Sequence, residues 1–126
     1  MNVDSIKLRK WETPFYSIRY LGNVRLRLIS MGTLVAQIEN LEEEERFRVT
    51  FNGMLGVRFE DAFNEERMIN SFVAEDSPWV ADMLKKPFRT RDISTASHYV
   101  IFSKDGRLDV VSTEDPKIEK DRPTIG

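Results

Sequence analysis

Hydrophobic and polar residues alternate along two long stretches of the chain, which is typical of strands that bury one face. In the first stretch, residues 15–29, tyrosine and aliphatic residues alternate with Arg19, Arg25 and Arg27. A loop at 21–23 keeps the apolar residues on one face, as strand register requires. We therefore predict a hairpin, and its register sets Arg19 opposite Arg25.

The second alternating stretch covers residues 46–60 and is interrupted by an Asn-Gly pair. A loop at 52–54 again collects the apolar side chains on one face, so the pattern predicts a second hairpin. Its polar face then carries Arg48 opposite Arg58. An apolar run at 33–38 predicts a further strand between the two hairpins.

The middle of the chain changes from a period of two to a helical period. Asn64 can cap a helix over 64–74, because its side chain accepts a hydrogen bond from a free amide of the first turn. Ser77 followed by Pro78 is a stronger helix start, and it predicts a helix over 77–86. We expect both helices to pack on the sheet.

The only histidine of the chain lies at the start of a last predicted hairpin. Strands at 98–103 and 107–112 are joined by a loop at 104–106, which places glycine where the left-handed conformation is needed. This register puts His98 and Asp109 on opposite faces, so they are not expected to pair. His98 is then interpreted as a structural residue at a strand end. The alternative is an acid or base catalyst oriented by a more distant carboxylate, because histidine titrates near neutral pH.

Together these elements predict an α+β fold. We expect a single domain over residues 1–116, with a mainly antiparallel, strongly curved sheet or partial barrel of about six or seven strands and two short helices packed on it. The charged residues 117–126 include a second proline and predict a loosely ordered tail.

Composition narrows the range of functions. The chain has 126 residues, a net charge of -2, no cysteine and one histidine. These counts exclude disulfides, thiolate nucleophiles and cysteine-ligated zinc, and we expect no metal site and no cofactor. The sequence lacks a signal peptide pattern and a long apolar run, so we expect a cytoplasmic protein that does not enter a membrane. No catalytic or phosphate-binding motif is present.

Arginine is the most informative residue type. Six arginines occupy predicted polar strand faces, and two predicted registers set arginine opposite arginine, which is destabilising without an anion between them. Either nearby acids such as Glu39, Glu60 and the run 42–45 supply the charge, or the face docks a carboxylate-rich partner. Trp11, in a basic segment before the first strand, is either a binding anchor or part of the domain's edge. The candidate partner-binding residues are Trp11, Arg19, Arg25, Arg27, Arg46, Arg48 and Arg58.

The main functional hypothesis is a small non-catalytic binding protein that docks an acidic protein surface. A nucleic-acid-binding accessory protein is the first alternative, and an enzyme using His98 is the second. Stacking aromatics interleaved with the arginines would favour nucleic acid, but the predicted face lacks them. In size and outline the chain resembles small bacterial immunity proteins, which neutralise a toxin by binding it; the resemblance rests on no motif and transfers no residues. The sequence leaves the partner's identity and homodimer formation through a strand edge open.

Overall fold

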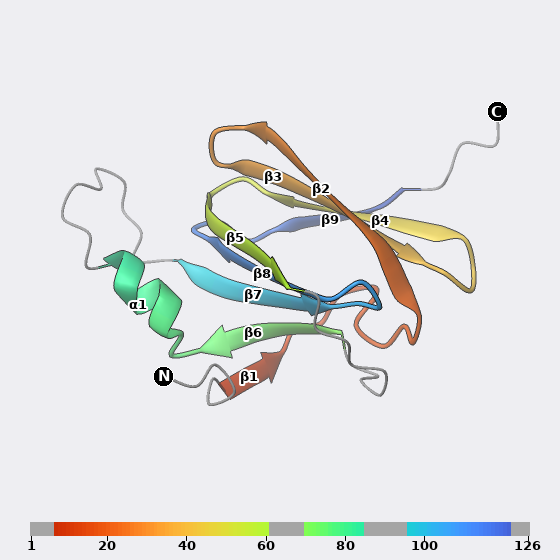
Figure 1. Ribbon diagram of the computed structural model, residues 1–126, viewed down its shortest axis with the longest axis horizontal. Helices are drawn as coiled ribbons and strands as arrows, with labels where there is room; N and C mark the ends of the chain where they lie inside the picture. Colours follow the sequence, from red (N-terminus) through yellow and green to blue (C-terminus); the bar gives the residue numbers. More distant parts are fainter. Residues whose placement is uncertain (1–6, 61–69, 85–95, 122–126) are drawn as a thin grey trace.

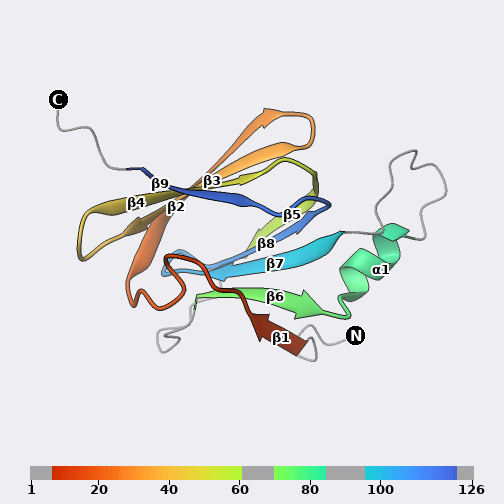
Figure 2. The ribbon, with the colours of Figure 1, turned by 180° about the vertical axis from the view of Figure 1, so that it is seen from behind.

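Two antiparallel sheets form the protein in the computed structural model, which describes residues 7–60, 70–84 and 96–121. The five-stranded sheet has the order β1 (Lys7–Lys10), β6 (Ser71–Glu75), β7 (Ser97–Phe102), β8 (Arg107–Ser112) and β5 (Met54–Glu60). The four-stranded sheet has the order β2 (Leu21–Ser30), β3 (Thr33–Asn40), β4 (Glu45–Phe51) and β9 (Lys117–Asp121). Helix α1 (Pro78–Leu84) joins β6 to the segment before β7 and lies beyond the ends of these two strands (Figures 1 and 2).

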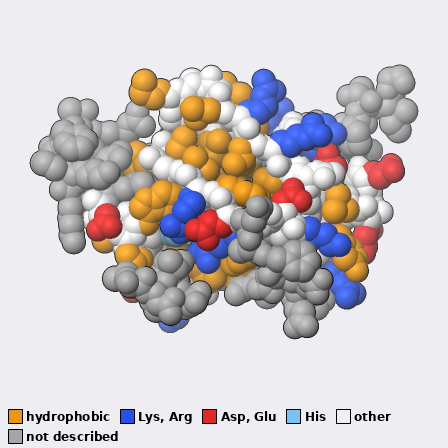
Figure 3. All heavy atoms as spheres, viewed as in Figure 1, with side chains coloured by type: hydrophobic (Ala, Val, Ile, Leu, Met, Phe, Trp, Pro, Cys, Tyr) orange, Lys and Arg blue, Asp and Glu red, His pale blue; other side chains and the backbone are white. Residues whose placement is uncertain are grey.

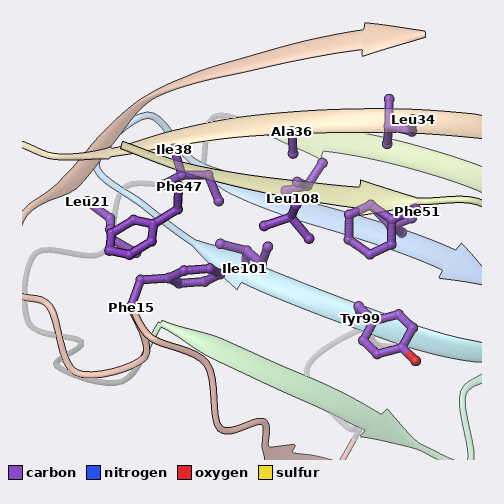
Figure 4. Close-up of a cluster of buried hydrophobic side chains, with 12 residues drawn as sticks. Phe15, Leu21, Leu34, Ala36, Ile38, Phe47, Phe51, Tyr99, Ile101 and Leu108 are labelled. Carbon is purple, nitrogen blue, oxygen red and sulfur yellow. The ribbon is translucent and has the colours of Figure 1, made fainter. Parts of the chain in front are cut away.

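The core lies between the two sheets, where each contributes alternate side chains. On β4 every second residue from Phe47 to Phe51 is buried, as the alternation predicts, and β3, predicted only as an apolar run, shows the same pattern. These residues face Tyr99 and Ile101 of β7 and Leu108 of β8 (Figure 4). Phe15 precedes β2 and closes one end of the core, with its ring 5.5 Å from that of Phe47. The apolar face predicted for β4 therefore lies in the core. The face predicted for β7 is wrong, because the three-residue loop sets Val100 opposite Val110, whereas Tyr99 and Ile101 are the residues that face the core beside Leu108 and Val110.

The α+β prediction is wrong, because the described chain is nearly all β. Residues 71–74 of the predicted 64–74 helix belong to strand β6, and residues 64–69 lie outside the described residues. Part of the predicted 77–86 helix is confirmed as α1, and residues 85–86 lie outside the description. A short apolar cluster fits one turn of helix and a strand equally well, so its period did not decide between them.

The single curved sheet is also corrected to two sheets, because the chain changes sheet where a hairpin was predicted. Strands β4 and β5 exist, but β4 pairs with β3 and β9, whereas β5 pairs with β8. Gly53 lies at this corner, where its carbonyl accepts a 2.8 Å hydrogen bond from the Thr113 amide. A side chain at 53 would collide with Thr113, so the close approach requires glycine.

The first predicted hairpin is replaced by a different pairing. Strand β2 runs unbroken through the expected loop at 21–23 and pairs with β3 across a turn at Gly32, whose φ is 87°. Residues 13–18 form turns instead of a strand, so Arg19 does not face Arg25. Part of the expected loose tail is corrected as well, because Lys117–Asp121 forms β9 against β4, and residues 122–126 lie outside the described residues.

Candidate functional site

The register of β7 and β8 brings His98 and Asp109 together. Val100 lies opposite Asp109, one residue away from the predicted pairing, because the connecting loop has four residues, 103–106, and not three. With this shift, His98 and Asp109 project from the same face of the five-stranded sheet. The prediction that these two residues cannot pair is therefore wrong. Their face is turned away from the core, and α1 packs against it at the His98 end, where the Trp79 ring lies edge-on to His98 at 5.4 Å.

Four side chains form a continuous hydrogen-bonded chain on this outer face, and we refer to it as the His98 network. Ser77 Oγ lies 2.8 Å from His98 Nδ1, and His98 Nε2 lies 2.7 Å from Asp109 Oδ1. Arg107 donates through Nε to Asp109 Oδ2 at 2.9 Å and through Nη2 to Oδ1 at 2.9 Å. The two ends of the network are thus a hydroxyl and a bidentate guanidinium.

The network has one consistent arrangement of protons when His98 is neutral. An ionised carboxylate can only accept, so His98 Nε2 carries the proton and donates to Asp109. His98 Nδ1 then accepts from the Ser77 hydroxyl. The same Ser77 oxygen accepts from the Val80 amide at 3.4 Å and so caps α1, which is the role that the sequence predicts for it.

Burial makes this network electrostatically strong. Asp109 is 0% exposed and His98 is 1% exposed. Burial by itself raises the pKa of Asp109, but hydrogen bonds from His98 and Arg107, together with the Arg107 charge, outweigh it and hold the pKa below its ordinary value. Asp109 therefore remains an anion inside the protein, where it orients the imidazole and can stabilise a second proton on it.

A surface hollow of about 660 Å³ lies beside the network, between β6, α1 and β7. Ser77 and His98 both line it, whereas Asp109 and Arg107 do not. Val80, Ala81 and Ala96 supply an apolar part of its wall. The Ser77 end of the network therefore borders the hollow, with Ser77 itself 7% exposed, and the carboxylate end is sealed.

A second unusual region lies on strand β2, at the end of the four-stranded sheet. Leu26 and Leu28 pair with Ala36 and Leu34, both buried in the core, and so project from the same inner face. Even so, Leu26 is 38% exposed and Leu28 is 65% exposed. These side chains lie on the core-facing side of the sheet, but the described part of the opposing sheet does not bury them.

Strand β5, at the end of the other sheet, shows the same feature. Val57 and Phe59 pair with the buried Val110 and Leu108, yet they are 40% and 38% exposed. The Met54 amide at the start of β5 donates to Gly32 O at 2.9 Å, which holds this strand beside the β2–β3 turn. Hydrophobic side chains gather over this part of the surface, flanked by lysine and arginine (Figure 3). We call the region formed by Leu26, Leu28, Val57 and Phe59 the open side.

The predicted arginine face forms only in part. Four of the six arginines share the outer face of the four-stranded sheet, where the register aligns β2 with β4; they are Arg25, Arg27, Arg46 and Arg48. Arg58 lies on the other sheet, and Arg19 stacks on Tyr20, 5.4 Å from its ring centre, before β2 begins.

Nearby acids neutralise several of these arginines, as one of the two interpretations expects. Arg46 lies 3.5 Å from Glu39, Arg58 lies 3.4 Å from Glu60, and Arg48 lies 3.3 Å from Glu119 of β9. The predicted pair of Arg48 and Arg58 does not form, because their strands belong to different sheets. Arg25 and Arg27 make no ion pair with any part of the chain that the structure describes.

Trp11 packs against the edge of the core. Its ring centre lies 5.0 Å from that of Tyr99 and 6.4 Å from that of Phe15, and its amide donates to Ser71 O. These contacts assign Trp11 a structural role and leave the exposed apolar residues of the open side as the better binding candidates.

Sequence reasoning missed the partners of His98 and the exposure of the open side. The spacing of Arg107 and Asp109, two residues apart on one strand face, was the available sign of a buried ion pair beside the histidine. No comparable sign marks Leu28, because alternation does not reveal which strand ends a sheet.

Within the described ranges 7–60, 70–84 and 96–121, no helix is long and apolar enough to cross a membrane. The same residues contain no cluster of three or more histidine, cysteine or acidic side chains that could hold a metal ion. Comparison of the chain with protein families, characterised proteins and solved structures gives no match, so the site must be interpreted from its own geometry.

Proposed function

We propose that this protein binds a partner protein by capturing an extended, acidic segment of it along strand β2, at the open side. The observation that carries the proposal is the exposure of core-facing side chains on both end strands. Monomeric proteins rarely leave a contiguous apolar surface of this kind uncovered unless it serves binding. An occupant that buries Leu26, Leu28, Val57 and Phe59 would complete the core.

The backbone of β2 provides the second part of the argument. The start of this strand is covered by the 103–106 loop, because the Val24 amide donates to Asp105 Oδ2 at 2.7 Å and the Lys104 amide donates to Leu21 O at 2.8 Å. From Arg25 onward, β2 has β3 as its only strand neighbour among the described residues. Unpaired amides and carbonyls on such an edge can pair with an added strand.

The alternation along β2 indicates which residue types an added strand should carry. Leu26 and Leu28 point inward, whereas Arg25 and Arg27 point outward and lack acidic partners in the described chain. A strand added beside β2 follows the same alternation of faces. Its inward residues are therefore expected to be apolar and its outward residues acidic.

A protein partner fits better than nucleic acid. Phe47 and Phe51 are buried in the core and offer no stacking surface. The cytoplasmic location and the likeness to immunity proteins stay predictions.

A charge-swap experiment tests the proposal with two synthetic peptides of alternating sequence, one valine/glutamate and one valine/lysine. The wild-type protein should bind the glutamate peptide more tightly by at least about tenfold, with a preference that weakens in high salt. The double variant Arg25→Glu/Arg27→Glu should invert that preference. The matched control is Lys7→Glu/Arg9→Glu on β1, the end strand of the five-stranded sheet, and it should keep the wild-type preference.

Hydrogen exchange of the peptide complex locates the binding strand. Slower exchange is expected for backbone amides in 25–30 of β2. Equal affinity of wild type and the β2 double variant for both peptides would contradict the proposal. Concentration-dependent dimerisation that buries the open side and blocks the peptide would replace the partner with a second copy of this chain.

A further inference from the structure

The Ser77 hydroxyl is placed for a chemical role that partner binding at the open side does not use. Its oxygen lies 2.8 Å from His98 Nδ1, the ring nitrogen left unprotonated by the Asp109 hydrogen bond. A serine becomes a nucleophile when an adjacent base can take its proton. Either imidazole nitrogen can act as that base, provided that the other one is held by an acceptor.

The rest of the network supports proton transfer to His98. Asp109 is fully buried and remains an anion, so it stabilises the imidazolium that forms when His98 accepts the serine proton. Arg107 fixes the carboxylate through two parallel hydrogen bonds. The Trp79 ring covers the imidazole and keeps it in one orientation.

Access and surroundings point to the substrate class. Ser77 and His98 line the hollow of about 660 Å³, so a small molecule in it can approach the serine oxygen. Val80, Ala81 and Ala96 line the same hollow and suit a short apolar group. Its charged wall residues are Arg9 and Glu75, which pair at 3.7 Å, and Asp76, so the wall does not favour an anionic ligand. This combination fits a small ester with an apolar acyl chain.

We propose that Ser77 is an acyl-accepting nucleophile with His98 as its base and Asp109 as the residue that positions His98. Ser77 Oγ attacks the ester carbonyl carbon and its proton moves to His98 Nδ1. The bond to the alcohol oxygen then breaks, and the alcohol leaves with the proton from His98. Water, deprotonated by His98, attacks the acyl-serine ester; the carboxylic acid leaves and the proton returns to Ser77.

A fluorophosphonate probe tests this proposal without knowledge of the natural ester. Attack by Ser77 on phosphorus forms the Oγ–P bond and releases fluoride, and the proton passes to His98. Mass spectrometry of the intact protein and of its peptides should show one phosphonyl group, located on Ser77. His98→Gln should slow labelling by at least about hundredfold, the lower range of general-base effects. Asp109→Asn should slow it as well.

Two serine variants separate reactivity from folding. Ser77→Asn keeps a side chain that caps α1 and should fold normally but take no label. Ser97→Ala removes the other serine that lines the hollow and should label at the wild-type rate. Circular dichroism and thermal unfolding confirm that each variant is folded.

No label on Ser77 of the folded wild-type protein would overturn the inference, as would an equal labelling rate in a folded His98→Gln variant. Peptide capture at the open side should be unchanged in Ser77→Asn, because that site is built from other strands. The two proposals can therefore fail independently.

Discussion

The His98 network and the open side each reverse the usual placement of residue types. At the network, a carboxylate, an imidazole and a hydroxyl are buried, but each has hydrogen-bond partners within the chain. At the open side, leucine and phenylalanine side chains of the inner sheet faces are exposed and nothing in the described chain covers them. The first region has its partners within the described chain, whereas the second has no cover there.

This difference determines what each region does for stability. Buried polar groups contribute little net stability while they are paired, but they become costly when one partner is removed. Leu28 of the open side has little to lose, because it is 65% exposed and already largely in water. Mutations should therefore be severe at the network and mild at the open side.

The largest effect is expected for Asp109→Ala, which leaves the Arg107 guanidinium and the His98 ring without their shared acceptor. Loss of one partner of a buried ion pair costs about 3–5 kcal/mol. Urea denaturation measures this as a lower midpoint with an unchanged slope. The control is Glu60→Ala, which removes an exposed carboxylate that also pairs with an arginine, Arg58, and should cost less than about 1 kcal/mol. Equal costs would show that the network is not sealed from water.

An intermediate effect is expected at alkaline pH from Tyr99, which lies between the sheets in the closed part of the core. Burial raises its pKa from 10.0 to about 12, assisted by its hydrogen bond to Asp115 and by the charge of that carboxylate. The pKa of Tyr99 is higher in the folded protein than in the unfolded chain, so the protonated phenol stabilises the fold. This stabilisation is complete below pH 10 and is lost as the pH rises toward about 12. Tyr99→Phe should flatten the fall in unfolding free energy over that range.

Denaturation midpoints measured at several alkaline pH values test this expectation. Tyr16→Phe, outside the core, should retain the wild-type fall. A Tyr99→Phe profile as steep as that of wild type would show that water reaches Tyr99 in the folded protein.

The sequence allows the inner face of β4 to be predicted, because its apolar residues all lie on one side of the strand. Phe47, Val49 and Phe51 are all buried as that pattern predicts. Strand pairing is not encoded in the same way. Two strands show the same alternation whether they form a hairpin or belong to opposing sheets. For this reason the sequence of β4 and β5 predicted a hairpin, although the chain crosses between the sheets at Gly53.

The candidate sites depended on details that alternation does not reveal. One additional residue in the 103–106 loop moves Asp109 to the face of His98, and both loop lengths agree with the glycine at 106. The pairing with Ser77 requires the start of α1 to lie against the His98 end of β7, which is a long-range contact. The helix start at Ser77 could be predicted because capping is a local interaction. The hydrogen bond from Ser77 to His98 could not be predicted, because it joins distant parts of the chain.

The smallest effect is expected for Leu28→Ala on the open side, and its meaning comes from comparison with Leu34→Ala. These two leucines lie opposite each other on β2 and β3 and project from the same sheet face, but Leu34 is buried and Leu28 is 65% exposed. Leu34→Ala creates a cavity and should cost about 2–5 kcal/mol. Leu28→Ala should change the unfolding free energy by no more than about 0.5 kcal/mol, yet it should weaken binding of the valine/glutamate peptide, because Leu28 contributes apolar contact only in the complex.

Urea denaturation measures the unfolding free energy of both variants, and peptide titration measures their binding. A large loss of stability in Leu28→Ala would mean that another part of the folded chain covers this leucine, and the open side would then be closed.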